Sequence, residues 1–237
     1  MNSEDGDSGL RRAERGRQNA GMPISRLDRF NRRHPWSHND HYGRWVVDRV
    51  VASKARTVLD IGCGTGNLAA RLRDRGLTVT ALEPDTATAE IAARRFAGDP
   101  AVRVVRAGFA EREPGRRWDA ITLVAVLHHL PLASTLREVR ESLAPGGRLV
   151  VVGCFRAAGL VDGFAALPAV AANPVVGMMR HPAPATAPPP HMSAPVADPR
   201  ETLTEIRAAV AAELPGARIR RRLFWRYSLV YDAPARE

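Results

Sequence analysis

The chain has 237 residues, 45% of them hydrophobic and 25% charged, which is enough for one globular domain with appendages. Its two cysteines, Cys63 and Cys154, are too few for a disulfide framework, so we expect a reducing, cytoplasmic setting. No apolar run reaches membrane-spanning length and the first residues lack a signal-peptide pattern, so we expect no membrane partner. Composition leaves the oligomeric state open between a monomer and a homodimer.

The net charge of +10 would suit a nucleic-acid partner, but its distribution favours another explanation. Lys54 is the only lysine, and such an excess of arginine could reflect genomic base composition rather than function. Arg218, Arg220 and Arg222 alternate, which places them on one face of a strand. Charges on an edge strand discourage pairing with other chains, so we expect structural or solubility roles and no nucleic-acid partner.

Three regions follow one another along the chain. Residues 1–22 are polar and charged and are expected to form a disordered tail. Residues 23–56 are expected to form an N-terminal helical cap, with helices at 25–33 and 38–52. Residues 57–237 are expected to form the main domain.

In the main domain, short apolar runs alternate with stretches of helical periodicity. The apolar runs predict buried strands over 57–61, 78–82, 102–106, 120–126 and 148–152. The periodic stretches predict helices over 67–75, 86–97 and 134–143. Strand–helix repetition with short connections indicates an α/β fold with a doubly wound parallel sheet.

The strand–helix alternation then gives way to a Pro-rich insertion over residues 155–199. Nine of the chain's 18 prolines lie between Pro168 and Pro199, which prevents a regular helix there. The apolar residues that precede most of these prolines, among them Leu160 and Phe164, are expected to lie over a pocket as a lid.

A last helix and two strands follow the insertion. Asp198 and Pro199 predict the start of the helix, as its N-cap and its first residue. Leu203, Ile206 and Val210 have the spacing of its buried stripe. Tightly joined strands, expected to be antiparallel, are predicted over 217–225 and 227–232.

Residues 58–66 read VLDIGCGTG, a strand that turns into a helix through glycines. Glycines in such a turn let backbone N–H groups approach a ligand closely. A dinucleotide fingerprint, G-x-G-x-x-G, would need its third glycine at Asn67, one residue after Gly66. Asp60 would repel a pyrophosphate but would suit an ammonium group. The loop therefore favours a nucleoside that carries an amino acid over a dinucleotide.

Glu83 ends the next predicted strand, 21 residues after Gly62. From this position a carboxylate can accept hydrogen bonds from both hydroxyls of a ribose, and Pro84 fixes the turn behind it. Taken alone, Glu83 could equally be a solvated loop acid. Its spacing from the glycine loop favours the ligand role.

From about Thr57 to Gly153 the chain resembles the S-adenosylmethionine (SAM)-dependent methyltransferases with a Rossmann-like fold, the class I family, and its small-molecule enzymes in particular. The matching stretches are VLDIGCGTG, ALEPD, WDAITLVAVLHHL and LREVRESLAPGGRLVVV. The resemblance implies a doubly wound, mostly parallel sheet of seven strands, with a C-terminal antiparallel hairpin and helices on both faces. It also implies methyltransferase activity with SAM as the cofactor.

The resemblance further implies a cofactor site at the glycine loop and at the ends of the neighbouring strands. The implied cofactor-binding residues are Tyr42, Asp60, Gly62, Cys63, Gly64, Gly66, Glu83, Pro84, Gly108, Phe109, Val124 and Ala125. The methionine part of SAM would face the glycine loop, and the ribose would face Glu83. The family usually has an acidic residue for the adenine amino group where this chain has Gly108. Adenine is therefore expected to be held by backbone groups and by packing against Phe109.

Two histidines, His128 and His129, follow the fourth predicted strand, where a histidine often lines the active site of the resembling enzymes. Histidine can serve as a general base near neutral pH, and we expect this catalytic role of His128 before His129. The alternative is that both residues only shape the turn into the next helix.

An unusual cluster of histidine and aromatic residues lies in the N-terminal cap, whose helices would close over SAM in this family. Tyr42 could cover the methionine carboxylate, and the expected substrate contacts are Trp36, His38, His41, Leu160 and Phe164. The histidines of this cluster leave no obvious third ligand for a metal, so none is expected.

The apolar lid favours methyl transfer to a hydroxyl, amine or carbon of a small, partly apolar acceptor. Three alternatives remain open. The net charge would fit an RNA or protein methyltransferase, Gly108 would fit a non-catalytic SAM-binding protein, and the glycine loop would fit a dinucleotide-dependent oxidoreductase.

Overall fold

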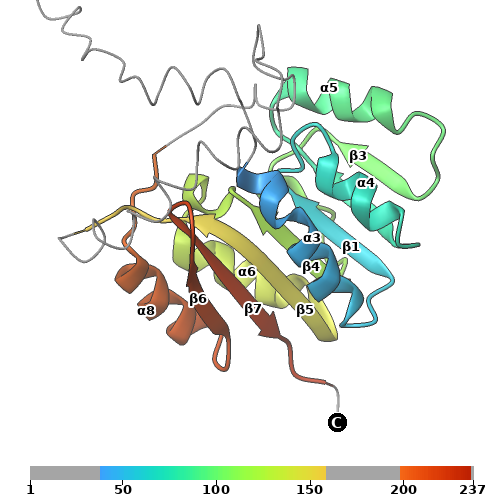
Figure 1. Cartoon of the computed structure of the whole chain (residues 1–237). Helices are drawn as coiled ribbons and strands as arrows, with labels where there is room; N and C mark the ends of the chain where they lie inside the picture. Colours follow the sequence, from blue (N-terminus) through green and yellow to red (C-terminus); the bar gives the residue numbers. More distant parts are fainter. Residues whose placement is uncertain (1–37, 159–197, 236–237) are drawn as a thin grey trace, which may run out of the picture.

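A computed structural model describes residues 38–158 and 198–235 (Figure 1). The predicted tail at 1–22, the predicted helix at 25–33 and most of the Pro-rich insertion lie outside these residues. All descriptions that follow concern the described ranges.

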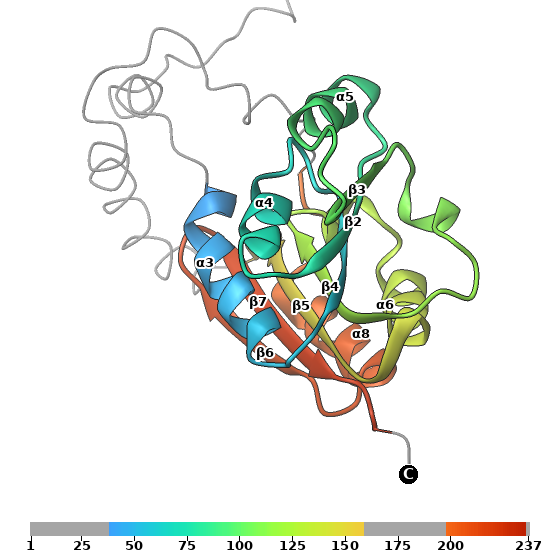
Figure 2. The same ribbon diagram turned by 90° about the vertical axis from the view of Figure 1, so that its right-hand side faces the viewer.

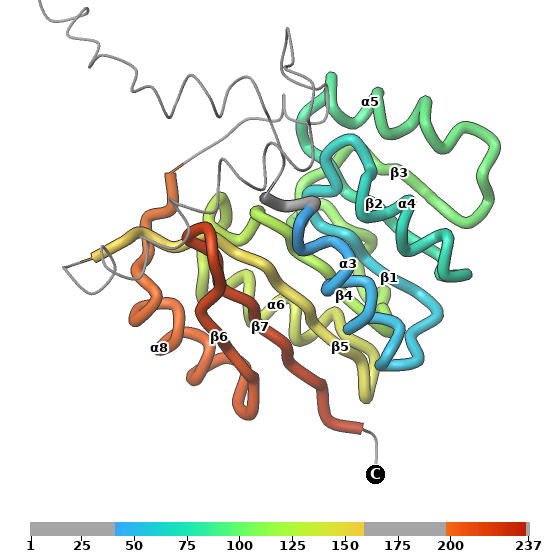
Figure 3. Tube along the Cα trace, in the orientation of Figure 1, coloured from blue at the N-terminus to red at the C-terminus, as the bar shows by residue number. Residues whose placement is uncertain are grey.

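Seven strands form one mixed sheet in the order β3-β2-β1-β4-β5-β7-β6. Their bounds are Thr57–Ile61 (β1), Thr78–Leu82 (β2), Val102–Val105 (β3), Trp118–Val124 (β4), Leu143–Cys154 (β5), Arg218–Arg222 (β6) and Arg226–Asp232 (β7). Strands β1 to β5 run parallel, whereas β7 is antiparallel to both β5 and β6 (Figure 3). The predicted doubly wound sheet with a C-terminal hairpin is therefore confirmed.

Helices cover both faces of this sheet (Figure 2). Helices α3 (His38–Val51), α4 (Asn67–Arg73) and α5 (Thr86–Arg95) share one core with the sheet. Helices α6 (Leu132–Ser142) and α8 (Leu203–Glu213) pack on the opposite face in a second core. Helix α3 contributes Val46 and Val50, both fully buried, to the first core, so it is packed directly onto the sheet.

The strand order reverses between β1 and β4, because the chain winds outward to β3 and then returns to the far side of β1. In sheets of this kind, ligands bind in the crevice beyond the carboxyl ends of the strands at such a switch point. The glycine loop follows β1, and the His128–His129 pair follows β4, so both lie at this point.

Most bounds differ from the predicted ones by only a few residues, but two elements start well away from their predicted first residues. The prediction that Asp198 and Pro199 start the last helix is wrong: Thr202 is its N-cap and shares a capping box with Glu205. In this capping box the side chains of Thr202 and Glu205 accept hydrogen bonds from each other's backbone N–H groups, whereas the earlier Asp-Pro pair precedes the helix. Strand β5 begins at Leu143 rather than at Arg148, because its first residues pair with Trp118 before a register shift.

Candidate active site

Three glycines shape the loop between β1 and α4, and all three have left-handed backbone conformations. Their φ angles are 67° at Gly62, 56° at Gly64 and 84° at Gly66. A Cβ atom on Gly62 would lie 2.3 Å from Val126 Cγ2, and one on Gly66 would lie 2.5 Å from the ring of Phe96. At Gly64 a Cβ atom would meet nothing within 4 Å among the described residues. Packing therefore requires glycine at positions 62 and 66, whereas among the described residues only the left-handed φ favours glycine at position 64.

Glu83 ties the end of β2 to this loop. Its Oε2 accepts a hydrogen bond from Gly64 N at 2.9 Å, and its Oε1 accepts one from Asp85 N at 3.1 Å. The side chain is buried, with 8% of its surface exposed, so Glu83 is not a solvated loop acid. Each carboxylate oxygen keeps a second lone pair that can accept a hydrogen bond from a ligand.

Asp60 is a buried acid directly before the loop. Its Oδ1 accepts a hydrogen bond from Thr122 Oγ1 at 2.7 Å, whereas no donor among the described residues reaches its Oδ2. Burial raises the pKa of this carboxyl to about 7, the nearby charge of Glu83 adds to the shift, and the bond from Thr122 opposes it. A buried carboxyl with one unpaired oxygen is suited to receive a cationic group.

The end of β4 lies directly against the glycine loop. Val126 packs over Gly62, and Ala125 before it has a left-handed φ of 57° while its N–H donates to Val152 O at 2.7 Å. Val124, the last residue of β4, is partly buried. The short helix η2 (Leu127–His129) follows directly, so the two histidines lie just after the strand end that packs against the loop.

His128 and His129 form a pair of rings in η2. Their ring centroids lie 4.1 Å apart with the planes tilted by 41°. His128 is half-buried and His129 is exposed. The structure thus places His128 just after the carboxyl end of β4, the strand that pairs with β1 and its glycine loop.

The segment after β3 contains an acid that the sequence analysis overlooked. Glu111, in the short helix η1 (Phe109–Glu111), reaches back so that its Oε2 accepts a hydrogen bond from Gly108 N at 2.7 Å. A side chain at position 108 would begin 3.6 Å from this oxygen. The spacing of three residues is that of a helix-capping acid, which is the signal that could have identified Glu111. Phe109 is buried in the core, and the Arg112 guanidinium lies 4.2 Å from its ring centroid.

On the N-terminal side, α3 brings two predicted residues to the β6–β7 hairpin. Tyr42 donates its hydroxyl hydrogen bond to Leu223 O at 3.1 Å, and burial raises the pKa of this phenol. The His41 ring meets the Tyr42 ring edge to face, at 4.9 Å between centroids. His38 is described only as the first residue of α3, and three predicted substrate contacts lie outside the described residues: Trp36, Leu160 and Phe164.

The last two predicted cofactor-binding residues are Cys63, in the glycine loop, and Pro84, after β2. Cys63 is buried, and its N–H donates to Leu82 O at 2.9 Å. Burial, with the charges of Asp60 and Glu83, raises the pKa of its thiol, so the sulfur remains protonated and unreactive. Pro84 is exposed behind the strand end.

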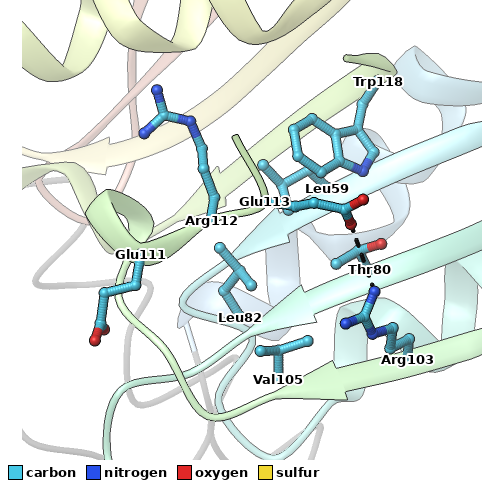
Figure 4. Close-up of a pocket in the computed structure, with 9 residues that line it drawn as sticks. All are labelled: Leu59, Thr80, Leu82, Arg103, Val105, Glu111, Arg112, Glu113 and Trp118. Atoms are coloured by element: carbon cyan, nitrogen blue, oxygen red, sulfur yellow. Dashed lines mark ion pairs between the residues drawn. The ribbon is translucent and has the colours of Figure 1, made fainter. Parts of the chain in front are cut away.

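A separate cavity of about 330 Å³ opens on the α6 face of the sheet, beside η1 (Figure 4). It is lined by Leu59, Thr80, Leu82, Arg103, Val105, Glu111, Arg112, Glu113 and Trp118. An ion pair between Arg103 and Glu113, 3.5 Å long, crosses it, and Glu111 points away from this pair (Figure 4). Of the predicted site residues within the described ranges, none lines this cavity.

Among the helices of the described ranges, none has the length and apolar composition needed to cross a bilayer.

Sequence comparison connects this geometry to known proteins. The family described as "Methyltransferase domain" matches residues 59–149. An uncharacterized methyltransferase of Mycobacterium tuberculosis is 38% identical over 206 residues, which cover 84% of this chain and 98% of that protein. A ubiquinone biosynthesis O-methyltransferase of Pseudomonas entomophila is 30% identical over 109 residues, or 44% of this chain and 47% of that protein.

Solved structures share the fold at low sequence identity. Magnesium protoporphyrin IX methyltransferase from Synechocystis, determined with bound SAM, has a TM-score of 0.55 at 16% identity, over 96% of this chain and 92% of that chain. Human N-acetylserotonin methyltransferase in complex with SAM also has a TM-score of 0.55 at 16% identity, over 91% of this chain and 61% of that chain. The chain therefore belongs to the SAM-dependent, class I methyltransferase family.

Proposed function

We propose that this methyltransferase transfers the methyl group of SAM to a hydroxyl, amine or carbon of a small, partly apolar molecule. The observation that carries the proposal is the buried carboxyl of Asp60, whose Oδ2 has no donor among the described residues, in the strand that leads into the glycine loop. When bound, SAM supplies an electrophilic methyl group on a sulfonium. The residues of the chain fit the other parts of this molecule.

The two ends of the cofactor call for different partners. Asp60 Oδ2 is the acceptor for an ammonium group, and the free lone pairs of Glu83 are acceptors for the ribose hydroxyls. Because Gly64 N–H already fixes the Glu83 carboxylate, the acid is oriented before a ligand arrives. Glu111 supplies an acid beside Gly108, where the adenine amino group needs an acceptor.

His128 is the proposed general base, because it is the half-buried member of the histidine pair beside Val126. It would take the proton from a hydroxyl or amine acceptor as the methyl group is transferred. Proximity and alignment of the acceptor with the methyl group would supply much of the remaining rate enhancement.

One relative supports a small acceptor: the ubiquinone biosynthesis O-methyltransferase, whose name indicates a small-molecule pathway. The match covers about half of that protein's length. The predicted apolar lid, with Leu160 and Phe164, points in the same direction. We also propose that the chain acts without nucleic-acid or membrane partners.

The test is to incubate the full chain with small-molecule extracts and with SAM carrying either a normal or a deuterated methyl group. We expect a product that gains one methyl group and shifts by the mass of the label in mass spectrometry. Cofactor binding by calorimetry without any labelled product would contradict the proposal and favour a non-catalytic SAM-binding protein.

Two matched variants then test the base. We expect His128→Ala to lower kcat by about 10²-fold, the usual contribution of a positioned base, with an unchanged affinity for SAM. His129→Ala, which alters the exposed neighbour, should retain most of the activity. Equal activity of the His128→Ala variant and the wild type would remove His128 from the mechanism.

A further inference from the structure

The turn that joins β6 to β7 has an unusual backbone. Residues 223–225 connect Arg222 to Arg226, which face each other as the last pair of the hairpin. Phe224 and Trp225 both have left-handed φ angles, of 59° and 54°. Two consecutive left-handed residues are typical of hairpin turns made by Asn-Gly, because other side chains are strained there. This turn has two aromatic residues despite that preference.

Contacts with α3 hold the turn in place. Tyr42 Oη donates to Leu223 O at 3.1 Å, across 181 residues of sequence. Phe224 is only 2% exposed, and its ring meets His41 edge to face at 5.7 Å between centroids. The turn is therefore fixed to the helix whose residues were predicted to contact cofactor and substrate.

The side chains on either side of Phe224 are exposed. Leu223 is 48% exposed and Trp225 is 37% exposed. Within the described ranges, Val51 is the only other large hydrophobic residue exposed to a similar degree, and it ends α3. Exposed apolar side chains on a turn that is held in place are suited to contact a ligand.

The turn lies at the end of the sheet formed by the carboxyl ends of the parallel strands, and the glycine loop and η2 lie at this same end. Arg226, directly after the turn, pairs with Cys154 at the carboxyl end of β5. Val152, two residues earlier in β5, pairs with Val124 at the carboxyl end of β4. The hairpin tip accordingly appears beside the start of α3 in both views of the chain (Figures 1 and 2). Strained backbone held by its surroundings is concentrated at ligand-binding sites.

We propose that Leu223 and Trp225 form an apolar wall of the acceptor site and select acceptors that carry an aromatic ring. This inference rests on the proposed function, because it takes the acceptor to bind at the same edge of the sheet. An indole offers a flat apolar surface on which a ring packs offset or edge to face. Neither side chain carries a charge, so selection would depend on shape and apolar area.

The test compares Leu223→Ser/Trp225→Asn with the wild-type full chain. Both positions are exposed, and asparagine tolerates a left-handed φ, so the fold should be retained. The probe is 1-naphthol, titrated by calorimetry into protein saturated with S-adenosylhomocysteine. We expect its affinity to fall by at least about tenfold in the double variant, as for other lost apolar contacts. Val51→Ser, which removes an exposed apolar side chain at the other end of α3, should change nothing.

Three outcomes would overturn the inference. They are absence of naphthol binding by the wild type, equal binding by the double variant, and a variant whose only change is from dimer to monomer in sedimentation velocity. The labelled-methyl assay separates this inference from the proposed function. Loss of naphthol binding in the variant, with no methylated product from any extract, would support the ligand contact while rejecting methyl transfer.

Discussion

The glycine loop and the β6–β7 turn both have left-handed backbone at the carboxyl ends of the parallel strands, but they place different residue types in that conformation. The loop uses Gly62, Gly64 and Gly66, which enter this region without steric cost. The turn uses Phe224 and Trp225, for which it is strained.

The difference lies in what each segment does with its side-chain positions. In the loop a side chain would collide with neighbours or fill the space over Gly64. In the turn, Phe224 packs its buried side chain into the protein and Trp225 exposes part of its side chain to solvent. Backbone strain is thus avoided in the loop, where added side chains at two positions would collide, and tolerated in the turn, where the buried Phe224 holds the segment in place.

The largest expected effect separates two glycines of the loop. Gly62→Ala should lower the free energy of unfolding by about 3 kcal/mol, because it combines a left-handed alanine with a collision against the stiff side chain of Val126. Gly64→Ala should cost only about 1 kcal/mol, the left-handed part alone, but should weaken SAM binding. Urea denaturation measures both.

Val126→Ala provides the control for this pair. In the Gly62→Ala background it should recover part of the lost stability, because it removes the colliding methyl groups. Equal losses in the Gly62→Ala and Gly64→Ala variants would show that packing does not distinguish the two glycines.

A second prediction concerns the buried carboxyl of Asp60, which precedes the glycine loop. The pKa of Asp60 is raised from its ordinary value of about 4 to about 7 in the folded protein, so between these pH values the folded state binds more protons than the unfolded state. The free energy of unfolding of the ligand-free protein should therefore fall as pH rises from about 4 to about 7.

Binding of S-adenosylhomocysteine should show the opposite trend, because its ammonium group needs the ionised carboxylate. Its affinity should rise about tenfold per pH unit up to about pH 7 and then level off, as measured by calorimetry. Asp60→Asn should bind weakly and lose this part of the pH dependence. An unchanged pH profile in Asp60→Asn would assign the titration to another group.

The smallest expected effect lies in the turn. Trp225→Asn should raise the free energy of unfolding by about 0.5–1 kcal/mol, because asparagine tolerates the left-handed conformation better than tryptophan. Thermal unfolding measures the gain. Leu223→Asn is the matched control, since Leu223 is also exposed but has no left-handed φ, and it should give no gain. A loss of stability in Trp225→Asn would mean that the indole contributes more by packing than its backbone costs.

The sequence predicted the parallel half of the sheet well because its signals are local. The bounds of β1 and β2 agree with the apolar runs at 57–61 and 78–82, and the stripe of Leu203, Ile206 and Val210 is buried as predicted. Each of these features depends on periodicity within one element.

The features that were missed depend on contacts between distant residues or on competing local signals. Asp198-Pro199 and Thr202-x-x-Glu205 both resemble helix starts, and only packing of the stripe decides between them. The turn at Phe224 lacks the Asn or Gly that usually marks it, and the bond from Tyr42 to Leu223 spans 181 residues. The unpaired oxygen of Asp60 likewise becomes visible only when β4 lies beside β1.

The position of β7 between β5 and β6 has a consequence for how the protein is made. In chain order β7 is the last of the described strands, yet it occupies an interior place in the sheet. Its residues from Tyr227 to Tyr231 are buried. During synthesis, one edge of β5 and both edges of β6 therefore have no strand to pair with until the ribosome has released Arg226–Asp232. Translation that stops before β7 would leave the edge of β5 open to pairing with other chains.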